Sequence, residues 1–146
     1  MTNPTRPSGP EGGTPGGFPA IIRATDDAQT SRGLIRENES AIILARAGYN
    51  VEQKPTVSGK ENPDYKIEGR IFDCYAPSTA KVYNIVDTIA SKVGKGQTDR
   101  IVLNLDDSKV SLEALRQQLT SNPIPNLLEI IIIKGETILE FFPFDA

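Results

Sequence analysis

The sequence predicts an α/β (α+β) fold, a mixed β-sheet flanked by helices with the element order α-β-β-β-α-β-α-β-β. Three observations support this prediction. Two pairs of strand-like segments each flank a short turn that contains glycine, which is typical of β-hairpins. One continuous apolar run has the pattern of a central strand covered on both faces. Three longer segments consist of helix-forming residues, and their apolar positions recur at helical spacing.

The length and composition are those of one globular domain that follows a polar N-terminal segment. The chain has 146 residues, of which 38% are hydrophobic and 24% are charged, a soluble globular balance. The first 19 residues, MTNPTRPSGPEGGTPGGFP, are mostly small, polar or proline, and they bury too little apolar surface to offset the entropy of ordering. We therefore expect residues 1–28 to be a flexible Pro/Gly-rich tether and residues 29–146 to be the folded domain.

The first two elements are a helix and a short strand. Residues 32–49, RGLIRENESAIILARAGY, contain strong helix formers and no proline, and Gly48 stands where a helix commonly ends. Residues 49–55, YNVEQKP, predict a short strand that Pro55 closes. The helix therefore leads directly into the sheet.

A hairpin follows. DYKIEG (residues 64–69) and RIFDCYA (residues 70–76) alternate apolar and polar residues on either side of Glu68-Gly69. Asp64 lies at the start of the first of these strands and Asp73 lies within the second. Aspartate is depleted in strands, so two aspartates in one hairpin require an explanation.

The second helix and the central strand come next. Residues 78–96, STAKVYNIVDTIASKVGKG, predict a helix with Ser78 or Thr79 as its N-cap. Residues 99–105, DRIVLNL, form the continuous apolar run. The buried face of the helix is expected to consist of Val82, Ile85, Val86, Ile89 and Val93.

The last elements are a third helix and a second hairpin. Residues 111–121, SLEALRQQLTS, predict a helix that Ser111 caps. Residues 127–143, LLEIIIIKGETILEFFP, predict two strands that turn at Gly135-Glu136.

The residue types that are missing exclude several kinds of chemistry. The chain has no histidine, which excludes Ser-His-Asp and Cys-His nucleophilic catalysis, histidine acid–base chemistry and histidine zinc sites. Cys74 is the single cysteine, so it forms neither an internal disulfide nor a thiolate cage for zinc. The net charge of −3 does not favour an electrostatic nucleic-acid binder. Any catalysis must use carboxylates, Lys, Arg, Tyr or a metal bound by oxygen.

No segment predicts insertion into a membrane. The longest apolar run, around LLEIIIIKG, has the length of a strand, and Glu129 interrupts it. The N-terminus lacks the basic and then apolar pattern of a signal peptide.

Three acidic residues are candidates for a metal site. Glu37 shares a helical stripe with Leu34, Ala41 and Leu44, so it faces inward, whereas Glu39 lies on the more solvated stripe of Arg46. Asp64 and Asp73 lie on adjacent strands of the hairpin. Carboxylates brought together from a helix and two strands form a site for a hard cation such as Mg²⁺ or Mn²⁺.

A lysine completes this candidate site. Lys92 lies at the margin of the buried face of the second helix, from which it can lean toward the hairpin and stabilise a developing oxyanion. Taken singly, the same residues also fit ordinary roles: a helix-margin glutamate, turn-capping aspartates and a lysine that reaches solvent. Their joint order along the chain favours the metal site.

This order of elements and charges resembles the PD-(D/E)XK nuclease superfamily, whose core is α-β-β-β-α-β. In that superfamily a helix glutamate is followed by an aspartate on one hairpin strand and a (D/E)-x-K motif on the next. Asp64 in NPD and Asp73 in FDCY match the aspartates, but Tyr75 stands where the lysine is expected. In many members the lysine lies on the following helix, where Lys92 is the matching residue.

A more specific resemblance covers Gly33 to about Pro143. The segments RENESAIILARAGYNVEQKP, NPDYKIEGRIFDCYAP and GQTDRIVLNLDDS are similar to the C-terminal tRNA-nuclease domains of contact-dependent growth-inhibition (CdiA-type) toxins. The resemblance implies metal-dependent cleavage of tRNA in the cytoplasm of a target bacterium after delivery as part of a larger toxin, and neutralisation by a cognate immunity protein. It also implies that Glu37, Asp64, Asp73 and Lys92 are catalytic, with the three acids binding Mg²⁺ or Mn²⁺, or alternatively Zn²⁺.

Further residues and two other functions remain open. Gln97, Arg100 and Asn104 flank the central strand and are candidates for contacts with the substrate backbone, although a solvated strand end would place them similarly. The same fold also occurs in DNA endonucleases, because a fold does not decide the substrate. A non-catalytic module that binds a partner protein is the third possibility, and the net negative charge and the missing motif lysine favour it.

Overall fold

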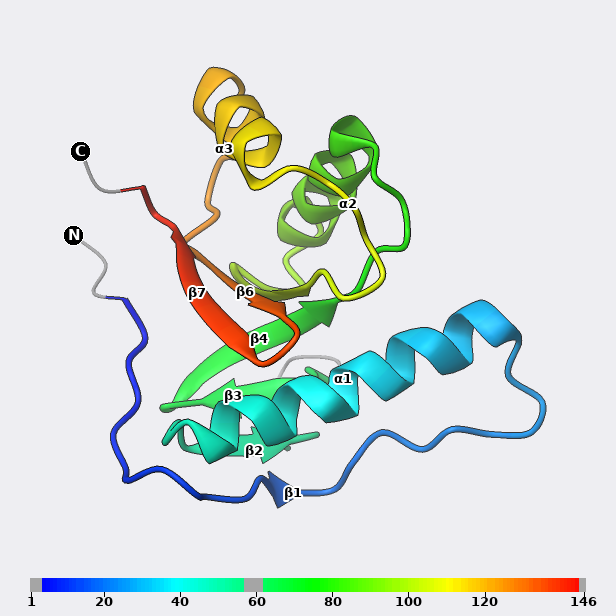
Figure 1. Ribbon diagram of the computed structural model, residues 1–146, viewed down its shortest axis with the longest axis vertical. Coiled ribbons are helices and arrows are strands. Elements are labelled where there is room, and N and C mark those ends of the chain that lie inside the picture. Colours follow the sequence, from blue (N-terminus) through cyan, green and yellow to red (C-terminus); the bar gives the residue numbers. More distant parts are fainter. Residues whose placement is uncertain (1–3, 57–61, 145–146) are drawn as a thin grey trace.

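Seven strands form one mixed sheet in the computed structural model, which describes residues 4–56 and 62–144 (Figure 1). The strands lie side by side in the order in which they occur in the sequence. The three central strands β4, β5 and β6 are parallel, while β3 and β7 pair antiparallel at the two sides. In chain order the elements are β1 (Gly16–Gly17), α1 (Ala28–Arg46), β2 (Val51–Gln53), β3 (Tyr65–Ile67), β4 (Arg70–Tyr75), α2 (Val82–Gly94), β5 (Arg100–Asn104), α3 (Leu112–Ser121), β6 (Glu129–Lys134) and β7 (Thr137–Phe142).

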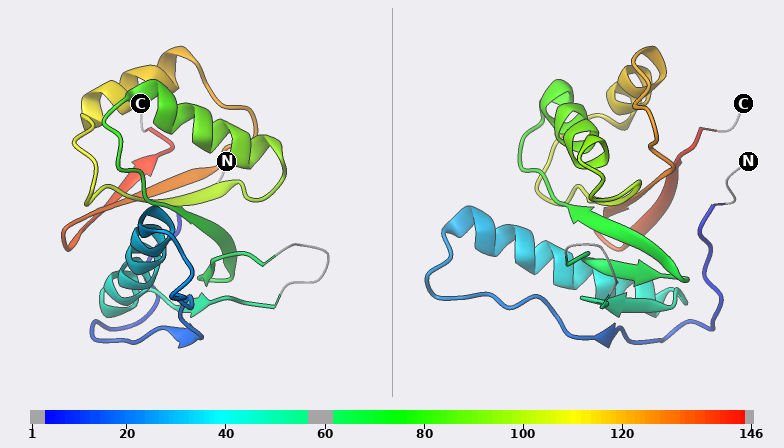
Figure 2. Two further views of the ribbon diagram at one scale, coloured as in Figure 1. Left: turned by 90° about the vertical axis from the view of Figure 1, so that its right-hand side faces the viewer. Right: turned by 180° about the vertical axis from the view of Figure 1, so that it is seen from behind.

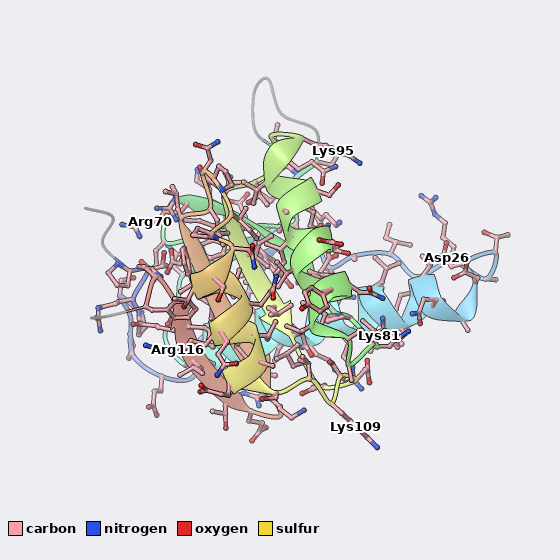
Figure 3. All side chains as sticks on the ribbon, turned by 90° about the horizontal axis from the view of Figure 1, so that it is seen from above. Asp26, Arg70, Lys81, Lys95, Lys109 and Arg116 are labelled. Atoms are coloured by element: carbon pink, nitrogen blue, oxygen red, sulfur yellow. The ribbon has the colours of Figure 1, made fainter. Side chains whose placement is uncertain are left out.

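The helices cover both faces of the sheet. Helices α2 and α3 connect parallel strands and lie side by side on one face, as the view from above shows, with Lys81 and Lys95 near the two ends of α2 (Figure 3). Helix α1 lies on the opposite face (Figures 1 and 2). Because apolar side chains alternate along each strand, the sheet separates two apolar cores. The α2–α3 side buries Ile85, Ile89, Ile101, Leu103 and Leu115, and the α1 side buries Leu44, Tyr65, Phe72, Val102 and Ile131.

The predicted order of elements is confirmed, with one short strand added at the front. The hairpin turns at Glu68-Gly69, where both residues have positive φ (50° and 80°), as a type I′ turn requires. Gly48 ends α1 with φ 102°, and Ser111 caps α3 by accepting a hydrogen bond from Ala114 N–H (3.2 Å).

Two helix starts differ from the prediction. Helix α1 begins earlier, at Ala28, because Asp27 accepts a hydrogen bond from Thr30 N–H (2.7 Å) and caps it. The predicted N-cap of α2, Ser78 or Thr79, is wrong, because the helix begins at Val82 and Lys81 is the N-cap residue. Thr79 Oγ1 instead accepts a hydrogen bond from Lys81 N–H (3.0 Å) just before the helix.

The N-terminal segment packs on the domain. Thr5 is 1% exposed and donates hydrogen bonds from N–H and Oγ1 to the buried carboxylate of Glu129 (both 2.7 Å). Strand β1 pairs in parallel with β2, and Ala20 is buried against Asn38. The described part of the segment that was expected to be a flexible tether therefore makes packing contacts, because backbone and side-chain hydrogen bonds replace the missing apolar burial.

Within the described residues, no helix combines the length and the apolarity that crossing a membrane requires.

Candidate active site

Two of the three predicted acids contact a lysine that the sequence did not single out, and the third is joined to one of them by a backbone hydrogen bond. Glu37 comes from the middle of α1, Asp64 immediately precedes β3, and Lys54 follows β2. Lys54 Nζ lies 3.2 Å from Glu37 Oε2 and 3.6 Å from Asp64 Oδ1, so one ammonium group contacts two carboxylates. The site thus joins the inner face of α1 to the ends of β2 and β3.

Backbone hydrogen bonds hold the two aspartates to each other's strands. Asp64 Oδ2 accepts from Cys74 N–H (2.8 Å), and Asp73 Oδ1 accepts a longer bond from Asp64 N–H (3.4 Å). Each carboxylate therefore bonds to the neighbouring strand, and this fixes its position at the end of the hairpin. The arrangement leaves lone pairs of both side chains for other partners, since a carboxylate accepts about four hydrogen bonds.

Glu37 is a buried charge without full compensation. The residue is 6% exposed, and within the described part of the chain its Oε2 atom has no hydrogen-bond partner besides the ion-pair contact with Lys54. Burial of an ionised group is costly unless it is paired or binds a metal. A buried, incompletely satisfied carboxylate next to two others therefore indicates a site that receives a further ligand.

Burial and the charge of Asp64 raise the pKa values of Glu37 and Asp73. Burial, reinforced by the negative charge of Asp64, raises the pKa of Glu37 to about 7, although Lys54 opposes the shift. Burial and Asp64 also raise the pKa of Asp73, against the opposing effects of the Asp64 N–H, Lys92 and Lys54. Burial would lower the pKa of Lys54, but the charges of Glu37 and Asp64 outweigh it and raise the pKa.

Tyr65 is a buried residue that holds α1 in place next to this cluster. Its ring is fully buried, and its hydroxyl donates to the Glu37 backbone carbonyl (2.6 Å). The bond joins α1 to β3 at Glu37. It fixes the backbone of Glu37, while the ion pair with Lys54 holds its side chain.

Lys92 lies near the acids, whereas two of the other predicted residues have structural roles. Lys92 is half-buried on α2, close enough to Asp73 for its charge to lower the pKa of that carboxyl. Asn104 is fully buried and donates from Nδ2 to Ser40 Oγ (2.8 Å), and its contact with a substrate stays a prediction. Arg100 donates from Nε to the buried Glu129 (3.1 Å).

The side chain of Arg100 is 14% exposed, and its contact with a substrate also stays a prediction. Both side chains bond to partners inside the fold. Gln97 is exposed after α2, and its contact with a substrate stays a prediction.

The donor atoms fit a hard cation, although they do not enclose one as they stand. The candidate ligands are carboxylate oxygens, which a hard cation prefers, and Glu37 Oε2 is incompletely bonded. Among residues 4–56 and 62–144, no three Asp, Glu or Cys side chains are grouped so that they could hold a metal ion. Lys54 instead neutralises part of the charge. Binding of one ion by Glu37, Asp64 and Asp73 stays a prediction.

Sequence patterns could not identify Lys54. Its φ is 52°, which takes the residue out of the period-two alternation of β2 and turns its side chain toward the acids. A non-glycine residue with positive φ is uncommon, but the sequence carries no signal for it.

Comparison with known proteins gives three consistent results. The family model "Contact-dependent growth inhibition CdiA C-terminal domain" matches residues 60–139, which include Asp64, Asp73 and Lys92. The chain is 48% identical over 130 residues to tRNA nuclease CdiA-2 of Burkholderia pseudomallei (strain 1026b), a match that covers 88% of this chain and 4% of that protein. A solved CdiA-CT/CdiI toxin and immunity complex from Burkholderia pseudomallei contains a chain with 47% identity and a TM-score of 0.81, and the match covers 88% of this chain and 99% of that one.

Proposed function

Because this chain belongs to the contact-dependent growth inhibition CdiA C-terminal domain family, we propose that it is a metal-dependent ribonuclease that cleaves tRNA as a toxin. The proposed chemistry rests on the buried carboxylate of Glu37, which is incompletely hydrogen-bonded and lies next to Asp64 and Lys54. The substrate is inferred from the name of the relative tRNA nuclease CdiA-2, which is 48% identical to this chain over 130 residues. A PD-(D/E)XK-like core is part of the same proposal.

Glu37, Asp64 and Asp73 would hold a Mg²⁺ or Mn²⁺ ion, or alternatively Zn²⁺. Such an ion, when bound, polarises the phosphodiester and makes a water molecule more acidic. Asp64 and Asp73 are suited to a binding role, because hydrogen bonds with backbone N–H groups already fix their carboxylates.

The protein side chains would divide the remaining work. The carboxylate of Glu37 accepts a hydrogen bond from the attacking water and orients it, or serves as a further ligand of the ion. The ammonium group of Lys92 stabilises the negative charge that develops on the phosphate. The ammonium group of Lys54 balances the charge of Glu37 and Asp64 until the site is loaded.

The family also suggests a partner and a place of action. A solved relative is described as a toxin and immunity complex, so we propose that a cognate immunity protein binds this chain and blocks its site. The matched region spans 4% of the relative named tRNA nuclease CdiA-2. We propose that the domain is delivered as part of a larger protein and acts in the cytoplasm of a target bacterium.

Cleavage assays with two substrates test this function. Purified protein is incubated with bulk tRNA and, separately, with plasmid DNA, in Mg²⁺, Mn²⁺, Zn²⁺ or EDTA. Cleavage of tRNA that depends on a divalent ion, with intact plasmid, is the expected result. Preferential cleavage of plasmid would identify a DNA endonuclease, and intact nucleic acids under every condition would leave a binding module as the better explanation.

A further inference from the structure

Helix α1 contains one glycine, Gly33, at a position where neither the backbone conformation nor the packing requires glycine. Gly33 lies inside the helix (Ala28–Arg46), where glycine is less favourable than alanine because it loses more backbone entropy on folding. Its φ is not among the positive values. A Cβ atom built at Gly33 meets no other atom within 4 Å among the described residues. Gly17 and Gly48, in contrast, have positive φ, and a Cβ at either would collide with backbone oxygen.

The position of Gly33 on α1 shows where this open space lies relative to the acidic cluster. Gly33 lies about one turn before Glu37 and two turns before Ser40, so all three point to the same side of α1. Glu37 and Ser40 are buried against the sheet at 6% and 0% exposure, whereas Gly33 is half-exposed. The N-terminal turns of α1 extend past the ends of β2 and β3 (Figures 1 and 2). The inward face of the helix therefore becomes open at Gly33, next to the acidic cluster.

Neighbouring contacts fix the helix in this position. On one side, Arg32 Nη2 donates to the Ala76 carbonyl (2.7 Å) and Gln29 Nε2 donates to Ser78 Oγ (3.0 Å), so the β4–α2 connection runs alongside. Arg32 and Arg36 also form ion pairs with Asp107 (2.7 and 2.9 Å). These bonds keep α1 from moving inward to fill the space.

The other side of α1 borders a surface groove that reaches the site. This groove is lined by Leu34 of α1, by Lys54 and Asn62, and by exposed apolar residues that include Phe18 and Ile21. Gly33 and Glu37 thus lie between this groove and the β4–α2 connection. A polymer that reaches Glu37 and Asp64 along this groove passes close to α1 at this point.

We propose that Gly33 is a positioning residue whose missing side chain lets the sugar–phosphate backbone of an RNA substrate lie against α1, next to Glu37. The proposal rests on the function proposed above and adds the path by which the polymer enters. A phosphodiester within a chain carries a nucleotide on either side, so the wall beside the site must accept more than the reacting phosphate. A side chain at residue 33 would displace the backbone without touching the acids.

Matched glycine variants test this proposal. Gly33→Ala and Gly33→Leu are compared with Gly94→Ala and Gly94→Leu on α2, because Gly94 is also helical, has an ordinary φ and has no described atom within 4 Å of a built Cβ. Melting temperature, kcat and KM for bulk tRNA are measured at saturating Mn²⁺. Both alanine variants are expected to melt at or above the wild-type temperature. Gly33→Leu is expected to lower kcat/KM roughly 100-fold, the scale of a displacement of about 1 Å, with Gly33→Ala in between and both Gly94 variants within about twofold of wild type.

Three other results would overturn either the role of Gly33 or the proposed function. Equal cleavage by Gly33→Leu and wild type would overturn the role of Gly33 and leave the nuclease function standing. A lower melting temperature of Gly33→Ala would show that the glycine serves packing, which also overturns the role. Absence of nucleic-acid cleavage by wild type and the Gly94 variants would overturn the proposed function, and this inference with it.

Discussion

Lys54 determines the electrostatics of the candidate site. Its ammonium group lies 3.2 Å from Glu37 Oε2 and 3.6 Å from Asp64 Oδ1, which is where a divalent cation would also be attracted. Two cations cannot occupy the same contacts with the same oxygens. At the level of single residues, the site is therefore stabilised by a lysine that a bound metal ion would have to displace.

Removal of this ammonium group should strengthen metal binding. We expect Lys54→Met to bind Mn²⁺ about tenfold more tightly than wild type, a change of about 1.4 kcal/mol, because competition for Glu37 and Asp64 is lost. Titration calorimetry measures the affinity without reference to activity. Lys66→Met, which removes an exposed lysine from β3, is the control and should bind as wild type does. Weaker binding by Lys54→Met would show that the lysine positions the acids instead.

Glu37 should make the stability of the metal-free protein depend on pH. Its pKa is about 7 in the fold and about 4.5 in an ordinary environment. Below the lower value the carboxyl is protonated in both states. Between the two values only the unfolded chain loses the proton, so the free energy of unfolding falls as pH rises through this window, by roughly 1–3 kcal/mol.

Urea unfolding between pH 4 and pH 8 in EDTA measures this effect. The raised pKa of Asp73 acts in the same direction, while the lowered pKa values of Glu68 and Asp107 oppose it, so variants must be compared at each pH. We expect Glu37→Gln to gain stability over wild type at pH 8 and to gain none at pH 4. A constant difference between the two proteins across the pH range would contradict the raised pKa.

At the scale of elements, sequence patterns predicted the features that depend on residues close together in the chain. The hairpin at Glu68-Gly69 and the stop of α1 at Gly48 follow from residues that tolerate positive φ. The inward direction of Glu37 follows from helical periodicity, and the structure places it on the buried face of α1. Contacts between residues far apart in sequence escaped prediction: the two glycines of β1 carry no side-chain pattern, and nothing near Thr5 indicates its bonds to Glu129.

The docking of the N-terminal segment can be tested through Thr5. Thr5→Val removes the hydroxyl that donates to Glu129 Oε1 and keeps the shape of the side chain. Because the carboxylate is buried, we expect a loss of about 1.5–3 kcal/mol in the free energy of unfolding, measured by urea denaturation. Ser8→Ala removes a hydroxyl bond to Glu68 near the surface (2.9 Å) and should cost less than about 0.5 kcal/mol. Equal, small losses for both variants would mean that the segment is not held at Thr5.

At the scale of the whole molecule, the sheet brings distant parts of the chain to one place. Glu37, Lys54, Asp64 and Asp73 come from four successive elements that meet where β2, β3 and β4 lie side by side under α1. The acids were predictable because each breaks a local rule: an inward glutamate and two aspartates in a hairpin. Lys54 and the buried partners of Asn104 and Arg100 were not, because they depend on how the elements pack.

The most direct test of the central claim measures tRNA cleavage by a matched pair of acidic variants in Mn²⁺. Asp73→Asn keeps an oxygen for the Asp64 N–H but removes the charge, while Glu39→Gln alters a half-exposed residue on another stripe of α1 that pairs with Arg36. We expect Asp73→Asn to lose roughly 100-fold or more of kcat, and its melting temperature in EDTA to match or exceed that of wild type, because one of several repelling carboxylates is gone. Glu39→Gln should cleave tRNA at the wild-type rate. Full cleavage by Asp73→Asn, or equal losses in both variants, would contradict the assignment of this acidic cluster as the active site.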